Sequence, residues 1–214
     1  ISLGSTIDNA QGFIANAGGG TVNISAVLGG LTPLTSASFT GGTINLGANV
    51  TTANGAIGIT GAVVLTATTT ISSGAGGGNI SFSSTINDGA GGPRDLTVTA
   101  GTGSVSIGGI VGTGPGNVAR PNNLLISGTG GITLTGAVYL VNSLDVAGGV
   151  VGTSQGGAIA LDGNLTVSGG TLTTNNNAID ITGTLSGAGT LTAGASTINI
   201  GTNLTVAAFN ANTS

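Results

Sequence analysis

Short segments in which every second residue is apolar recur along nearly the whole chain of 214 residues. Alternation with a period of two is typical of β-strands that bury one face and expose the other. The clearest segments are residues 21–25, 43–47, 56–60, 79–83, 131–135, 158–162, 178–182 and 197–201. The sequence therefore predicts some twenty short strands of three to six residues.

The spacing of these segments predicts that they stack. The interval from Ile24 to Ile44 nearly equals the interval from Ile181 to Ile200. Such a constant period, of roughly 20 residues, indicates one structural unit that is repeated many times. Gly and β-branched residues are poor helix formers, and no window carries apolar residues with helical spacing, so we expect almost no helix.

Two all-β architectures use such strands, a meandering sandwich or barrel and a parallel β-helix. Tight hairpins would join strands of more even length in the first. A repeat of roughly 20 residues favours the second, because one three-sided coil of short strands consumes about that many. We predict a parallel β-helix of about nine or ten coils with roughly 20 residues per coil, a rod roughly 45 to 50 Å long.

Asn precedes an apolar residue at several of the expected corners. We expect these Asn residues to take a left-handed backbone conformation and to bond through their amides to the Asn of the next coil. The residues concerned are Asn79, Asn123, Asn164 and Asn203.

The pattern is interrupted near residues 87–95, 112–122 and 151–157, and it resumes after each interruption. We interpret these stretches as loop insertions in a single β-helix that spans residues 1–214. Insertions in solenoids often project from the binding side. Neither end carries a recognisable cap, so we expect the segment to stack on more of its own chain or on copies of itself.

Composition excludes some partners and locations. The chain carries two Arg and six Asp, with no Lys, Glu, His, Cys, Met or Trp, and its net charge is −4. Nucleic-acid binding needs clustered Lys and Arg, so this partner is not expected. The longest fully apolar run, residues 137–141, is far too short for a membrane-spanning helix. Abundant, periodic Ile, Val, Leu and Thr argue against disorder.

The texture of the sequence resembles that of filamentous-haemagglutinin-like adhesins and related β-strand-repeat surface proteins of Gram-negative bacteria. The resemblance is clearest in residues 59–73, 78–83 and 95–108, where a Gly-led strand, a Thr-rich strand and a Gly-Asn-Ile-Ser-Phe segment follow one another. It implies a right-handed parallel β-helix, export across the outer membrane, and a role in adhesion, biofilm or surface filaments.

Paired carboxylates are the first candidate for catalysis, because many β-helices cleave polysaccharides. Asp162 and Asp180 are about one repeat apart and fall in adjoining coils, with Asp145 one coil earlier. No cation lies within that stretch, and Tyr139 is the only Tyr or Trp available to stack on a sugar. We therefore interpret these aspartates as solvated surface groups and predict no catalytic residue.

Calcium and ice are weaker candidates. Asp88, Gly89 and Asp95 share a polar loop, and carboxylates suit Ca²⁺, but the calcium-binding solenoid repeat is missing. An exposed pair between Arg94 and one of these aspartates is the favoured interpretation, and such a pair contributes little. Thr-x-Thr pairs that could order water do not recur at one phase in consecutive coils; they are Thr97/Thr99, Thr133/Thr135 and Thr171/Thr173.

These observations predict a secreted, non-enzymatic segment of a cell-surface fibre or adhesin, without metal or cofactor. Its partners are expected to be further coils of its own kind, and a carbohydrate or host-surface ligand. Two alternatives stay open: a subunit that polymerises end to end, and a β-helix that binds or cleaves polysaccharide.

Overall fold

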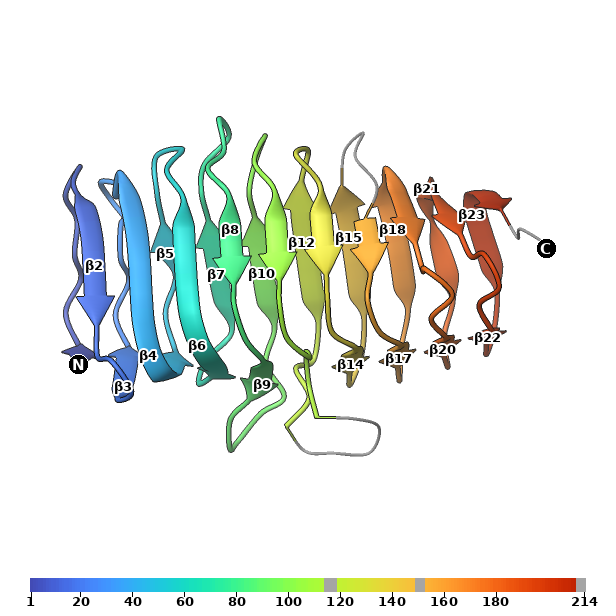
Figure 1. The fold of residues 1–214 in the computed structure, drawn as a ribbon, viewed down its shortest axis with the longest axis horizontal. Coiled ribbons are helices and arrows are strands. Elements are labelled where there is room, and N and C mark those ends of the chain that lie inside the picture. Colours follow the sequence, from blue (N-terminus) through green and yellow to red (C-terminus); the bar gives the residue numbers. More distant parts are fainter. Residues whose placement is uncertain (114–118, 149–152, 211–214) are drawn as a thin grey trace.

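The computed structural model describes residues 1–113, 119–148 and 153–210. These residues form a stack of parallel strands, and the described part of the chain contains no helix, so none that could cross a membrane. Successive coils of about 21 residues give about nine turns. The first and last described strands lie at opposite ends of a rod (Figure 1). The predicted parallel β-helix is confirmed.

Each turn passes through three faces, which we number in the order in which the chain meets them after Gly12. The first face contains β2 (Gly12–Asn16), the starts of β4 (Ser36–Leu46) and β6 (Ile57–Leu65), β8 (Ile80–Phe82), β11 (Val105–Ile107), β13 (Ile132–Leu134), β16 (Thr153–Gln155), β19 (Thr171–Thr173) and the ends of β21 (Leu185–Thr192) and β23 (Leu204–Asn210).

The second face contains β1 (Ser2–Leu3), β3 (Thr21–Ile24), the ends of β4 and β6, β9 (Ile86–Asp88), the bridging residue Val111, β14 (Val138–Leu140), β17 (Ile159–Leu161), β20 (Ile179–Ile181) and β22 (Ile198–Ile200). The third face contains β5 (Val50–Thr51), β7 (Thr69–Ser72), β10 (Leu96–Thr99), β12 (Leu124–Gly128), β15 (Leu144–Gly148), β18 (Leu165–Gly169) and the starts of β21 and β23.

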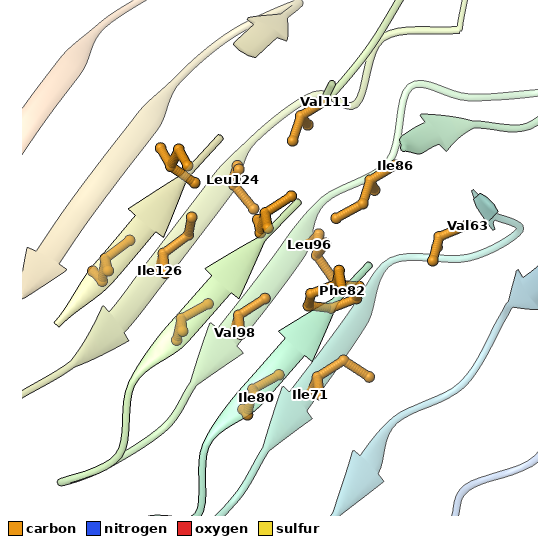
Figure 2. Packing of buried hydrophobic residues seen from close by; sticks show 14 of the residues in the cluster. Val63, Ile71, Ile80, Phe82, Ile86, Leu96, Val98, Val111, Leu124 and Ile126 are labelled. Carbon is orange, nitrogen blue, oxygen red and sulfur yellow. The ribbon is translucent and has the colours of Figure 1, made fainter. Parts of the chain in front are cut away.

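The core is built from columns of apolar side chains that repeat once per turn. On the third face, leucines pair in register through five successive turns, and each is at most 1% exposed: Leu96, Leu124, Leu144, Leu165 and Leu185. Figure 2 shows such residues from three faces meeting in the interior. Each fully buried Leu stabilises the stack by roughly 1.5 to 3 kcal/mol before ordering costs are subtracted.

The Asn residues at the corners behave differently from the prediction. None of the four has a positive φ, and the amides of Asn79, Asn123 and Asn164 accept a hydrogen bond from the backbone N–H directly above them in the next turn. The donor–acceptor distances are 2.9 to 3.1 Å. The prediction of left-handed, amide-to-amide corners is wrong, because the N–H just before a strand has no ladder carbonyl below it and the side-chain oxygen takes that place.

Two turns are longer than the others. The turn from Ile71 to Val98 and the turn from Val98 to Ile126 both contain more residues than the turn from Ile126 to Val146, although all three join paired positions of the ladder. Extra residues near 89–95 and 112–122 leave at the corner between the second and third faces, and the described parts of both loops project on the same side of the rod (Figure 1). The first of these turns also has a longer connection, residues 73–79, between β7 and β8. Residues 114–118 lie outside the described part of the chain.

The third interruption predicted from the sequence, 151–157, falls partly outside the described residues, since 149–152 are not described. The flanking register is that of an ordinary turn, because Val146 pairs directly with Val167.

Candidate functional site

Five of the eight charged residues gather at the corner from which the two loops leave. We call this group the charged edge, and it consists of Asp88, Arg94, Asp95, Arg120 and Asp162. The two arginines are the only basic residues of the chain. A corner that combines inserted loops with most of the charge is the natural place to look for chemistry.

Asp88 is buried because of its position in the ladder. It pairs in register with Leu65, so it occupies an inward-facing position that other turns fill with an apolar residue. Its side chain is fully buried. A buried carboxylate needs a partner charge, and Arg94 provides it at 3.0 Å.

The loop that follows wraps around the Arg94 guanidinium. Besides Asp88 Oδ1, this group donates to the carbonyl oxygens of Gly89 at 3.0 Å, Ala90 at 2.9 Å and Leu65 at 3.3 Å. Gly92 closes over the other carboxylate oxygen, Oδ2, so tightly that an added Cβ would lie 1.3 Å from it. The pairing of Arg94 with an aspartate is confirmed, but the expectation of an exposed pair is wrong.

This geometry also shows why the loop is not laid out for calcium. The oxygens of Asp88, Gly89 and Ala90 that would face a cation already face the guanidinium. Asp88 Oδ2 has no hydrogen-bond partner and borders an open hollow of about 390 Å³, otherwise lined by residues 89–92 and Ala119. In the described ranges, no group of three or more acidic, His or Cys residues converges as a metal site would require.

Asp95 has separate partners and joins the two loops. Its Oδ1 accepts hydrogen bonds from the side-chain amides of Asn122 and Asn123, each at 2.8 Å, and from the Asn123 backbone at 3.2 Å. Asn122 N–H in turn donates to the Arg94 carbonyl at 2.7 Å. The bases of the loops are therefore fastened to one another, and Asp95 does not share a site with Asp88.

Arg120 reaches two turns along the rod to Asp162, a contact that the sequence did not reveal. Its guanidinium donates to Asp162 Oδ2 and to the Leu140 carbonyl at 3.1 Å. The Arg120 side chain is 8% exposed and that of Asp162 53%. The hydrogen bond from Arg120, helped by its charge, holds the pKa of Asp162 below its usual value, although partial desolvation opposes this.

The aspartates considered for catalysis do not form a carboxylate pair. Asp180 pairs in register with Ala160, which precedes Asp162 by two residues in the chain. Asp180 is exposed and projects outward from the second face. Asp145 lies on the third face and accepts a hydrogen bond from Ser168 at 2.6 Å. The cation missing from the sequence argument is Arg120, which lies 42 residues before Asp162.

The Thr-x-Thr pairs are also separated. Thr97 and Thr99 lie on the third face in β10, whereas Thr133 lies in β13 and Thr171 and Thr173 lie in β19 on the first face. They do not build one flat array of threonines.

At the charged edge, then, each carboxylate is bound to an Arg or an Asn, and each Arg is bound to backbone carbonyls as well. Such an arrangement anchors the loops at their bases, so the strands of the second and third faces can stack from turn to turn without interruption. Comparisons of the chain with protein-family models, with curated proteins and with solved structures give no match.

Proposed function

We propose that this chain is a rigid, non-enzymatic rod segment of an extracellular surface fibre or adhesin, of the filamentous-haemagglutinin-like kind. The observation that carries the proposal is the unbroken column of paired leucines from Leu96 to Leu185, together with the parallel ladder around it. A structure in which each turn contacts only its neighbours extends in one direction and suits a spacer.

The surface supports an exposed location. Outward positions are mostly Thr, Ser, Asn, Ala and Gly, and the chain has no Lys. Trypsin-like proteases cut after Lys or Arg, and both Arg residues are sheltered. Arg94 is hydrogen-bonded and its side chain is only 17% exposed, while Arg120 is 8% exposed, hydrogen-bonded and followed by Pro121, which blocks such cleavage. The engaged carboxylates of the charged edge support the non-enzymatic part of the proposal.

A second candidate, end-to-end assembly, is favoured by one observation. The leucine column continues to Leu204 in β23, where it is 47% exposed, although Leu185 directly below is fully buried. Phe209 is likewise 39% exposed above the buried Leu191. Exposed positions that continue columns of the core fit a further coil, from the same chain or from another copy.

The rod is tested by a distance measurement. The chain has no Cys, so Ser2→Cys with Asn199→Cys introduces two unique labelling sites in one outward column of the second face, nine turns apart. Energy transfer between dyes at these two sites should report a narrow distribution of distances centred at about 43 Å. A broad distribution of distances in the absence of denaturant would contradict a rigid rod.

Surface attachment and assembly are tested separately. Beads coated with the chain should bind cell or polysaccharide surfaces above the level of uncoated beads, and failure would remove the adhesin role while leaving the rod. For assembly, rods should lengthen with concentration in negative stain. Leu204→Asp should abolish this lengthening, whereas Thr205→Asp, which adds the same charge to the outward side of the same strand, should preserve it; rods of constant length would exclude the second candidate.

A further inference from the structure

The outward column of the second face contains a gap. Its residues, in consecutive turns, are Ser2, Asn23, Asn45, Val64, Asn87, Gly112, Tyr139, Ala160, Asp180 and Asn199. Gly112 therefore lies between Asn87 on one side and Tyr139 on the other, with no side chain of its own. Because neighbouring strands are about 4.8 Å apart, the two flanking side chains start roughly 10 Å from each other.

Gly112 maintains this gap through its backbone. Its φ is +74°, and an added Cβ would lie 2.3 Å from the Tyr139 carbonyl oxygen. Both facts disfavour any larger residue here. The result is an open hollow of about 360 Å³ lined by Thr85, Asn87, Ile110, Gly112, Thr113 and Tyr139.

Asn87 lines the hollow and carries an unused polar group. Earlier in the same column, Asn45 donates its amide to Asn23 Oδ1 at 2.7 Å, so these side chains satisfy one another. The neighbours of Asn87 are Val64 and Gly112, which have no polar side chain to offer. Asn87 Oδ1 is consequently buried and without a hydrogen-bond partner, a state that a ligand donor would relieve.

The opposite wall and the edge are apolar. Tyr139 is the only Tyr of the chain and is half-buried, and Ile110 is 44% exposed although it is a large aliphatic residue. An amphipathic ring that faces an amide across a hollow offers a flat surface and hydrogen bonds to the same ligand. None of the six lining residues is charged.

From this arrangement we infer that the hollow between Asn87 and Tyr139 binds a sugar unit of a neutral oligosaccharide. The apolar C–H face of a pyranose packs on Tyr139 and Ile110. One of its hydroxyl groups donates to Asn87 Oδ1, which becomes accessible when the Asn87 side chain turns toward the hollow. Thr85 and Thr113, which line the same hollow, supply hydroxyl groups for the rest of the ring. The absence of a charged lining residue selects neutral sugars over uronic acids. The inference is independent of the rod, since it concerns the flank of the second face.

The chain carries its own reporter for this test. With one Tyr and no Trp, the intrinsic fluorescence comes from Tyr139 alone. Titration with cellotriose, mannotriose and the trimer of N-acetylglucosamine should change that fluorescence saturably for at least one of them, while trigalacturonate should leave it unchanged. Absence of saturation with all three neutral trimers, or tighter binding of trigalacturonate, would overturn the inference.

Variants localise the binding. Asn87→Ala should weaken the affinity about 2- to 10-fold, the range of one lost hydrogen bond, and Ile110→Ser should weaken it in the same direction. Asn45→Ala, which removes the same side chain from the same column two turns away, is the matched control and should bind normally. Equal affinities of wild type, Asn87→Ala and Ile110→Ser would place binding elsewhere and refute the site. The dye-pair distance is measured on the same proteins, so a failed titration leaves the rod proposal untouched.

Discussion

The turns that carry inserted loops and the plain turns nearer the C-terminus share one core but are fastened differently. Leu96 and Leu124 pair in register across a turn with an inserted loop, and Leu165 and Leu185 pair in the same way across a plain turn. All four leucines are at most 1% exposed. The added residues leave the coil at its corners, and the chain then resumes the ladder in the same register. Core packing therefore tolerates large changes in turn length, provided that each loop is closed at its base.

The closures differ in chemistry. In the plain turns, a side-chain oxygen such as that of Asn164 binds the next N–H, here that of Thr184 at 2.9 Å. In the inserted turns, Asp88 with Arg94 and Asp95 with two Asn residues do this work with charge. The comparison teaches that the core columns hold the rod together, while contacts at the corners determine where a loop can be inserted.

The largest effect is expected in the shared core. Phe82→Ala removes a side chain that is 1% exposed and should lower the free energy of unfolding by about 3 to 5 kcal/mol in a urea titration. Phe209→Ala, in the last turn of the same face, should lower it by about 1 kcal/mol, because Phe209 is already 39% exposed. Equal losses would show that the last turn is as tightly packed as the inserted ones.

Breaking the buried ion pair should come next. Arg94→Gln leaves the buried Asp88 carboxylate without its counter-charge and should cost about 3 kcal/mol in the same titration. Adding Asp88→Asn to this variant should restore part of the loss, since the unpaired charge is removed. Additive losses in the double variant would mean that the loop is not closed by the pair.

A plain-turn corner should matter less. Asn164→Ala leaves the Thr184 N–H without its acceptor and should lower stability by about 1 kcal/mol. Asn199→Ala, an exposed and outward-facing Asn on the second face, is the control and should change stability by less than about 0.5 kcal/mol. A loss in the control as large as that in Asn164→Ala would contradict a specific corner contact.

The smallest effect should appear in the pH dependence. Because Arg120 lowers the pKa of Asp162 in the folded chain, the pair stabilises fully above about pH 4, and this contribution disappears as the pH falls through the lowered value. Asp162 is 53% exposed, so the effect should stay below about 1 kcal/mol. The urea midpoint of Asp162→Asn should approach that of wild type as the pH is lowered from 6 to about 2. A constant difference across this range would assign the stability to packing of Arg120.

Much of the architecture was predictable because it rests on a repeated local pattern. Alternation around Ile44, Ile181 and Ile200 specifies strands, and their near-constant spacing specifies parallel stacking. The interruptions predicted near 87–95 and 112–122 mark where the pattern stops, but the first was placed too early, because Asn87 and Asp88 belong to β9 and pair with Val64 and Leu65. Local propensity and global fold agree along such a chain, so a pattern suffices.

The individual contacts were not predictable in the same way. Arg120 meets Asp162 two turns away, and Asn87 faces Tyr139 across Gly112, because one particular register brings them together. A one-residue change in that register would turn each side chain to the other side of its strand.

By itself, the sequence determined that short strands alternate and repeat, since burial of every second residue is a local demand on the chain. Only the tertiary structure decided which outward residues become neighbours and that Asp88 points inward, because these depend on the exact residue count between successive turns.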